Sequence, residues 1–421
     1  MLLMTGTVSG AGIGIISQYK HNGVASCATS VCHGKLKIQK KENVWLNEYR
    51  IWTGEDRHSQ AYRTLENDDS KKIAAKLGLK SARTAKICLD CHADNVPKSK
   101  RGRKFQIRDG VGCEACHGGS EKWIKSHAEE RVTHQQNIKA GLYPTDKIDE
   151  RADLCLSCHL GTRDKFATHM IMGAGHPRLG YELETFTANQ PAHYTVDEDY
   201  IERKGRPPGF NAWVLGQISA AQRYVALLQS SVFTGKGLFP ELALYDCHSC
   251  HHPMDDIRWT KRRTGGAVKP GTLRLQTHYF VGLEAAATVL NDKADGARLR
   301  TLVNALLKAG QQSKNAVATA AGKLDVWLSE HRQQWKKRKL KVGDVRKIRR
   351  QLLLLAAADK ASDYNAAEQV FLSVEAMSYV VGDVEKREAA LDRLFKAVED
   401  DKTFKPSRFV TTVKAIAGGF R

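Results

Sequence analysis

The sequence predicts a mainly α-helical protein with much irregular structure, in which a cysteine-rich region precedes a C-terminal helical bundle. All ten cysteines lie between Cys27 and Cys250, in a part of the chain with few long periodic segments. From Thr272 onward cysteine is absent, and apolar residues recur at the three- and four-residue spacing of amphipathic helices. These observations predict a first domain over residues 27–263 and a helical domain over residues 272–421.

The individual helices are predicted from the same spacing. Within the first domain, residues 213–228 should form one long helix, because a glycine and proline cluster at 205–209 precedes an apolar periodic run. A basic, glycine-rich segment over residues 261–270 is the expected domain boundary. Beyond it, helices joined by short loops are expected over residues 283–290, 299–307, 345–358 and 364–379.

Length and composition are those of a globular protein. The chain has 421 residues, enough for two or three domains, and its hydrophobic content of 42% is sufficient for packed cores. No run reaches the roughly 18 to 20 apolar residues that span a bilayer. Residues 1–26 are expected to be a leader, either a degraded or truncated export signal or a disordered tail.

The cysteines form five pairs, and a histidine directly follows the second cysteine of every pair. Two residues separate the cysteines in four of the pairs, and four residues separate them in the first. The five motifs are Cys27…Cys32-His33, Cys88…Cys91-His92, Cys113…Cys116-His117, Cys155…Cys158-His159 and Cys247…Cys250-His251.

This pattern is the attachment signature of haem c, in which two thiols add to the porphyrin vinyl groups and the next histidine binds the iron. Zinc sites use similar cysteine pairs but do not require a histidine after each one, and disulfides would leave the histidines unexplained. The sequence therefore predicts five covalently attached haems. Because such attachment takes place outside the cytoplasm, the protein is expected to be periplasmic or extracellular.

Eleven further histidines are available as second axial ligands, which favours iron held by two histidines over iron held by histidine and methionine. Each candidate could instead be an ordinary helix-start or loop histidine. His21 and His331 are expected to be surface residues without a ligand role. The candidate ligands are His58, His127, His134, His169, His176, His193 and His278.

Residues 27–160 resemble the multihaem cytochromes typified by cytochrome c-554, the tetrahaem acceptor of electrons from hydroxylamine oxidoreductase. The resemblance is carried by the spacing of Trp52 and His58 after the first motif, by the string Gly110–Gly118 around the third motif, and by His127 ten residues after it. It implies closely packed haem pairs with His58 and His127 as distal ligands. It also leaves open whether the haem at His92 has a second ligand, because the corresponding haem of that family is five-coordinate.

Electron transfer between redox proteins is the leading functional hypothesis, since five haems with two histidines each would form a chain of one-electron carriers. The alternatives are an oxidoreductase acting on a small nitrogen or sulfur compound at one open haem, and a structural or binding protein. The formal net charge of +20 favours acidic partner surfaces and allows peripheral membrane contact, whereas nucleic-acid binding conflicts with export. The basic run at 336–341 is expected to be a solvated helix end.

Overall fold

The computed structural model describes residues 18–36, 45–205, 209–235, 240–251, 267–268, 272–358, 361 and 363–420. The start of the predicted leader and most of the predicted boundary segment at 261–270 lie outside these residues. The fold is mainly α-helical with irregular connections, as predicted. Within the described residues, β-structure consists of isolated bridges such as the one between His21 and Arg101.

The chain divides into two compact units. The first contains the residues up to Cys158, Met170–Pro177 and Ala188–Pro207, and the second contains His159–His169, Arg178–Thr187 and Pro208–Arg421. Three helices lie where the chain passes from one unit to the other: α8 (Ile148–His159), α9 (His169–Gly173) and α10 (Leu183–Asn189).

The first unit is built from short helices. One of its buried apolar clusters consists of alanine, leucine and tyrosine side chains around Leu65 and Leu89. Side chains cap the N-termini of several of these helices. The Asn67 side chain accepts a hydrogen bond from Ser70 N at 2.8 Å, and Thr133 and Gln136 form a capping box. The elements are η1 (Val24–Ser26), α2 (Glu48–Gly54), η2 (Arg57–Gln60), α3 (Ala61–Thr64), α4 (Asp68–Lys76), α5 (Lys86–His92), η3 (Lys98–Lys100), η4 (Ile107–Asp109), α6 (Cys113–His117), η5 (Ser126–Ala128), α7 (His134–Lys139) and α11 (Glu198–Lys204).

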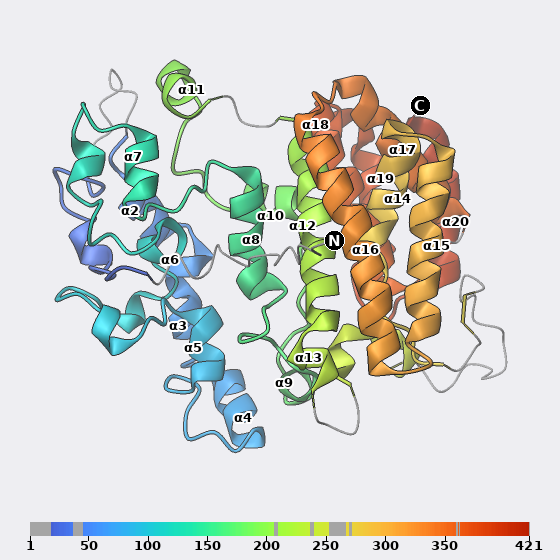
Figure 1. Cartoon of the computed structure of the whole chain (residues 1–421), viewed down its shortest axis with the longest axis horizontal. Helices are drawn as coiled ribbons and strands as arrows, with labels where there is room; N and C mark the ends of the chain where they lie inside the picture. The colour runs from blue at the N-terminus through green and yellow to red at the C-terminus, as the bar shows by residue number, and fades with distance from the viewer. Residues whose placement is uncertain are drawn as a thin grey trace, which may run out of the picture. The chain divides into compact units, whose positions relative to one another are not determined.

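The second unit is a bundle of longer helices that lie side by side (Figure 1). Helix α12 packs on α14 and α16, and α17 packs on α14, α18 and α20, around a core that includes Trp327, Trp335 and Phe409. The elements are α12 (Asn211–Gln229), α13 (Ser231–Thr234), η6 (Leu242–Leu244), η7 (Cys247–Ser249), α14 (His278–Leu290), α15 (Lys293–Ala309), α16 (Lys314–Lys337), α17 (Val342–Ala357), α18 (Tyr364–Val381), α19 (Val384–Lys396), α20 (Pro406–Ala417) and η8 (Gly418–Phe420).

The predicted helices are present as α12, α14, α15, α17 and α18, each within or a few residues beyond the expected range. Three further helices, α16, α19 and α20, were not predicted. Helix α16 nevertheless has a readable signal, since Ser313 caps its start and Val317, Ala321, Leu324 and Leu328 follow at helical spacing and are buried.

His21 and His331 are not surface residues, contrary to the expectation from the sequence. His21 is fully buried, and its Nδ1 lies 2.7 Å from a carboxylate oxygen of Asp94. His331 is also buried, with Nε2 at 2.7 Å from Asp295 and Nδ1 at 2.7 Å from the Trp327 carbonyl. Each histidine is the hydrogen-bond partner of another polar group in the interior. A single sequence does not show whether a histidine is buried in this way or exposed.

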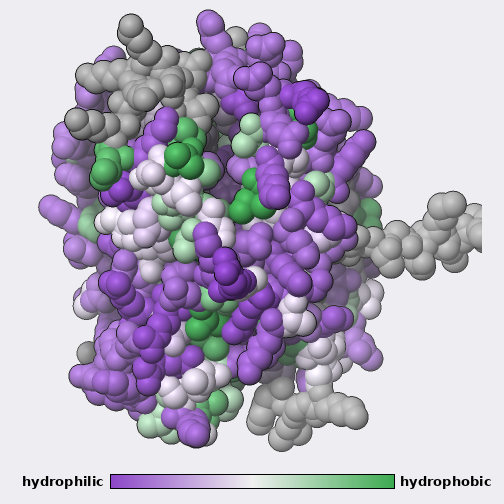
Figure 2. Space-filling model, turned by 90° about the vertical axis from the view of Figure 1, so that its left-hand side faces the viewer, coloured by the Kyte–Doolittle hydropathy of each residue, from purple (hydrophilic) through white to green (hydrophobic). Residues whose placement is uncertain are grey.

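The surface of the α2 and α7 side is mainly hydrophilic, with hydrophobic groups in small separate patches (Figure 2). In the part of the chain that is described, no helix is both long and apolar enough to cross a membrane.

Candidate functional site

The five motifs fold in a similar way despite their different lengths. Four of the second cysteines lie on or directly after a helical turn, in α5, α6, α8 and η7, so that the histidine follows within one turn. In the fifth motif, His251 N donates to the Cys247 carbonyl at 2.8 Å. In the first motif, His33 N donates to the Cys27 carbonyl at 3.1 Å, although two more residues lie between them. The longer spacer therefore loops out while the histidine keeps its backbone link to the first cysteine.

Four motif histidines face another histidine across a nearly constant gap. The ring centroids are 6.1 Å apart for His33 and His127, 6.3 Å for His92 and His176, 6.2 Å for His117 and His193, and 6.1 Å for His251 and His169. The first three pairs lie in the first unit and the fourth lies in the second. Each pair joins a residue of an attachment motif to one of the predicted second ligands.

This gap is too wide for ring stacking and suits an atom held between the rings. Two iron–nitrogen bonds of about 2 Å each, together with the two ring radii, put the centroids of axial imidazoles roughly 6 Å apart. The planes are nearly parallel for His33 and His127, at 13°, and nearly perpendicular for His117 and His193, at 89°. Both orientations are compatible with axial ligation, because an imidazole can rotate about its bond to the metal. The residues present therefore fit covalently held haem.

Hydrogen bonds to Nδ1 orient several of these rings. Nδ1 lies 2.9 Å from a Glu48 carboxylate oxygen in His33, 3.1 Å from the Ala61 carbonyl in His92, and 2.7 Å from the Pro177 carbonyl in His176. A metal-binding histidine generally donates its other ring N–H in this way, which fixes the tautomer and presents Nε2 to the metal. Gly175, with φ of 123°, makes the tight turn that leads into His176.

The local electrostatics differ between the motifs. Burial lowers the pKa of His117 to about 3 and also lowers that of His92, so both imidazoles are neutral at physiological pH, as metal binding requires. The hydrogen bond with Glu48 instead raises the pKa of His33. A carboxylate partner increases the basicity of an imidazole ligand, so the first motif would offer a bound iron a stronger donor than the second motif would.

The fourth motif histidine has an aromatic environment. The His159 ring lies 5.3 Å from the Tyr181 ring and 5.1 Å from the Phe186 ring, measured between centroids. The predicted ligand His58 lies in the other compact unit, at η2. Its Nδ1 is 2.9 Å from a carboxylate oxygen of Asp56. Burial raises the pKa of Asp56, but the hydrogen bonds that this carboxylate accepts from His58 and Gln190 hold its pKa at about 2.

Two of the predicted ligands have a different setting. His134 begins α7, and its Nε2 lies 3.1 Å from a carboxylate oxygen of Asp146. His278 begins α14 and is buried against the Tyr279 ring, with a centroid distance of 3.7 Å. Burial lowers the pKa of His278 to about 4. Of the candidates for the His251 iron that the sequence suggests, His169 is the one whose ring faces His251.

Neighbouring attachment sites are linked through their thiols. Cys27 and Cys113 share a hydrogen bond, which lowers the pKa of Cys27 and raises that of Cys113. Cys116 has its pKa raised mainly by burial and further by Cys155 and Cys158. These contacts bring the first motif to the third and the third to the fourth.

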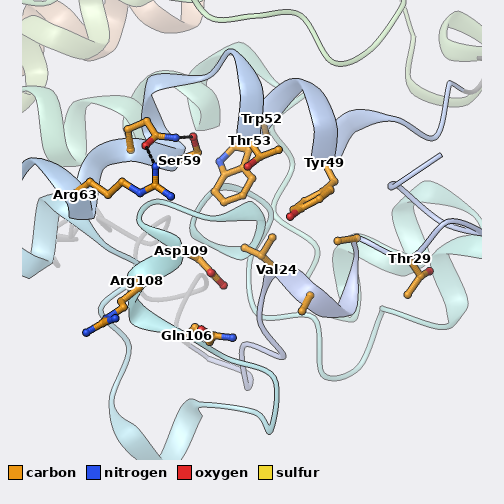
Figure 3. A pocket seen from close by; sticks show the side chains of 13 residues that line it. Val24, Thr29, Tyr49, Trp52, Thr53, Ser59, Arg63, Gln106, Arg108 and Asp109 are labelled. Atoms are coloured by element: carbon orange, nitrogen blue, oxygen red, sulfur yellow. Dashed lines mark hydrogen bonds between the residues drawn. The ribbon is translucent and has the colours of Figure 1, made fainter. Parts of the chain in front are cut away.

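A cleft of about 530 Å³ opens beside the first motif (Figure 3). Tyr49 and Trp52 of α2 line one side of it, and Arg63 and Arg108 lie at its edge. Its lining contains Ala25, Ala28 and Thr29 from around Cys27 but no histidine. Its two guanidinium groups suit carboxylates.

The sequence did not identify Glu48 and Asp56 as partners of His33 and His58. The Asp56 side chain accepts from His58 N as the cap of η2, and an Asp two residues before a His is a local signal for that role. Glu48 has no comparable signal, because the chain separates it from His33 by 15 residues.

Residues 26–118 match the model of a protein family described as cytochrome c554 and c-prime. The match covers the first three attachment motifs. No curated protein and no solved structure matches the chain.

Proposed function

We propose that this chain, whose N-terminal region is that of a multihaem c-type cytochrome, carries five haems and transfers single electrons between redox proteins. Each bound haem would supply an iron that cycles between the ferric and ferrous states. The chain itself attaches the haems through its ten cysteines, supplies the axial imidazoles and fixes their orientation. Electron transfer is the general role of this class of cytochrome, whereas the haem number and the ligand assignments below are our proposals.

The four histidine pairs with 6.1–6.3 Å centroid separations are the observation that carries the proposal. We assign each pair as the two axial ligands of one iron. His127, His176, His193 and His169 are then the second ligands of the first, second, third and fifth haems. The assignment does not include His134 or His278. His58 remains a candidate second ligand that the family resemblance implies, and it is not assigned to a particular haem.

The pairing of His92 with His176 distinguishes electron transfer from catalysis. An oxidoreductase acting on a small nitrogen or sulfur compound needs an iron with an open position. The second haem is the site where the family resemblance allows such a position. Since the His176 ring stands 6.3 Å from that of His92 and is oriented by the Pro177 carbonyl, the arrangement favours a closed, electron-carrying site.

The thiol contacts support an order of haems that differs from their order in the sequence. The first motif touches the third through Cys27 and Cys113, and the third neighbours the fourth through Cys116. Burial is the main cause of the lowered pKa of His92. The charge of Cys158 acts on this histidine in the opposite direction, so the fourth motif lies near the second. We propose that electrons pass among these four haems in the order first, third, fourth, second, or the reverse.

The partners and the location follow from charge and attachment chemistry. A formal net charge of +20 would fall by about ten units if all haem propionates ionise, which leaves a basic surface. We therefore propose donor and acceptor proteins with acidic docking surfaces. Thioether formation outside the cytoplasm supports a periplasmic or extracellular location, with peripheral membrane contact as an option.

Electron paramagnetic resonance of the oxidised protein tests the proposal, because it separates low-spin irons with two imidazoles from high-spin irons with an open position. We expect five low-spin irons per chain. A ferrous protein that binds no carbon monoxide would agree with this result. One high-spin iron that binds carbon monoxide would instead support the catalytic alternative.

A further inference from the structure

Glu182 lies inside the segment that surrounds the fourth motif histidine. Its neighbour Tyr181 and the nearby Phe186 are the two aromatic residues whose rings lie 5.3 and 5.1 Å from that of His159. Glu182 precedes α10, and its Oε2 accepts from Thr185 N at 2.7 Å. The carboxyl group is thus held by the same short stretch of chain that packs against His159.

The Glu182 carboxyl is buried, and it takes part in none of the ion pairs found among the described residues. Its side chain is 1% exposed, and Oε1 is a buried oxygen with no hydrogen-bond partner among the described residues. A buried carboxylate in such a setting is costly, whereas a carboxylic acid is tolerated. Burial accordingly raises the pKa of Glu182 to about 7, and the negative charge of Glu184 adds to the effect.

The elements packed against this segment supply few charges. From α18, Gln369 Nε2 donates to the Tyr181 carbonyl at 2.9 Å, and the Leu372 carbonyl accepts from Thr185. From α12, Gly216 meets Leu183. The titratable and charged groups on the surrounding elements are Glu184, the Arg178–Glu368 ion pair, Tyr364, Glu375 and Tyr379 of α18, Arg223 and Tyr224 of α12, and Tyr181 and His159.

We propose that Glu182 is a proton-binding site coupled to the redox state of the haem at His159. The inference rests on the proposed electron-transfer function. When the donor protein delivers one electron and ferric iron becomes ferrous, Glu182 Oε1 takes up one proton from the solvent. When the electron leaves to the acceptor protein, that proton is released, so that each transfer moves one electron and up to one proton.

The direction follows from electrostatics. Reduction removes one positive charge at the iron, so a nearby carboxylate loses a favourable interaction and its pKa rises. A buried carboxyl whose pKa is raised to about 7 then gains protons on reduction at constant pH. The midpoint potential should therefore fall as pH rises, by at most about 59 mV per tenfold change in proton concentration for a one-electron couple.

The test compares the haem-loaded wild-type protein with the isosteric variant Glu182→Gln and the control Glu375→Gln. Glu375 is a second glutamate of the same unit whose pKa is raised by burial. Infrared difference spectra between the oxidised and reduced states would report a protonated carboxyl gained on reduction. Proton uptake on full reduction at pH 7, in weakly buffered solution, would give the number of protons.

We expect the carboxyl band in the wild type and in Glu375→Gln, and we expect its loss in Glu182→Gln. Proton uptake by Glu182→Gln should be lower than that of the wild type by up to one proton per chain. Carbon-13 labelling of glutamate should shift the band in the wild type, which tests the proposal even if the variant folds poorly. A wild-type spectrum without a labelled band, or equal uptake in all three proteins, would overturn the proposal. Such a result would leave the five low-spin irons, and hence the proposed function, untouched.

Discussion

Replacing His176 by alanine should open one iron and only one. His176 lies in a loop, partly exposed, and its ring contact is with His92 at 6.3 Å between centroids. The substitution therefore removes little packing and should leave the fold of the first unit intact. Removal of the imidazole that we assign to the second haem leaves that iron five-coordinate.

The expected magnitude follows from the motif count. One of five irons, a fifth of the total, should change from low-spin to high-spin in the paramagnetic resonance spectrum. The potential of that haem should rise, on the order of 0.1 V, because loss of an imidazole donor favours ferrous iron. Carbon monoxide should then bind to one ferrous haem per chain, and added free imidazole should restore the low-spin signal.

His134→Ala is the matched control, since His134 is a predicted ligand whose Nε2 lies against Asp146. We expect its spectrum to equal that of the wild type. If His176→Ala kept five low-spin irons, the reasoning from ring separations would be refuted for the second haem. A high-spin iron in the His134 variant would refute the exclusion of His134.

Three other measurements test separate parts of the description. Intact-mass spectrometry under denaturing conditions should show five haems, about 3 kDa in total, and a mass corresponding to four would indicate that the first motif is unused. His169→Ala should give one high-spin iron while His278→Ala gives none, and the opposite result would transfer the fifth iron to His278. Arg349→Ala should destabilise the second unit by about 3 kcal/mol in denaturant unfolding, because it removes the buried guanidinium that lies 2.6 Å from the Asp383 carboxylate, although Arg387 still pairs with that carboxylate at 3.5 Å. The bond to Arg349 lowers the pKa of Asp383. The stabilisation from this ion pair should therefore be present above the ordinary carboxyl pKa and be lost as pH falls through the lowered pKa. An equal loss of stability in the variant at low and at neutral pH would contradict this reasoning.

The attachment sites are predicted from the sequence alone because their chemistry is local. Two cysteines and a histidine must lie within one turn of chain, so their spacing alone predicts covalent haem. The bundle helices were similarly predictable where their apolar faces were continuous, as in α12 and α18. Helix α16 was missed although its buried face includes Val317, Leu324 and Leu328 at helical spacing.

The second ligands could be nominated from the sequence but not paired. His92 and His176 are separated by 84 positions, and nothing in the local chain around either residue specifies the other. The same holds for His169 and His251, which lie 82 positions apart. Loop closure over long distances is decided by the packing of the whole unit, which a local pattern does not contain.

The hydrogen bonds at Nδ1 suggest how the chain divides this task. The Pro177 carbonyl lies next to His176 in sequence, and Asp56 lies two residues before His58, so the orientation of each ring is set by its own short segment. Only the position of that segment depends on the rest of the fold. A ligand built in this way can be carried by an irregular loop and still present Nε2 correctly, because its tautomer and rotation are already fixed. In the first unit, the local bond at His176 therefore helps to hold one of the three ring pairs, whose separations are 6.1–6.3 Å.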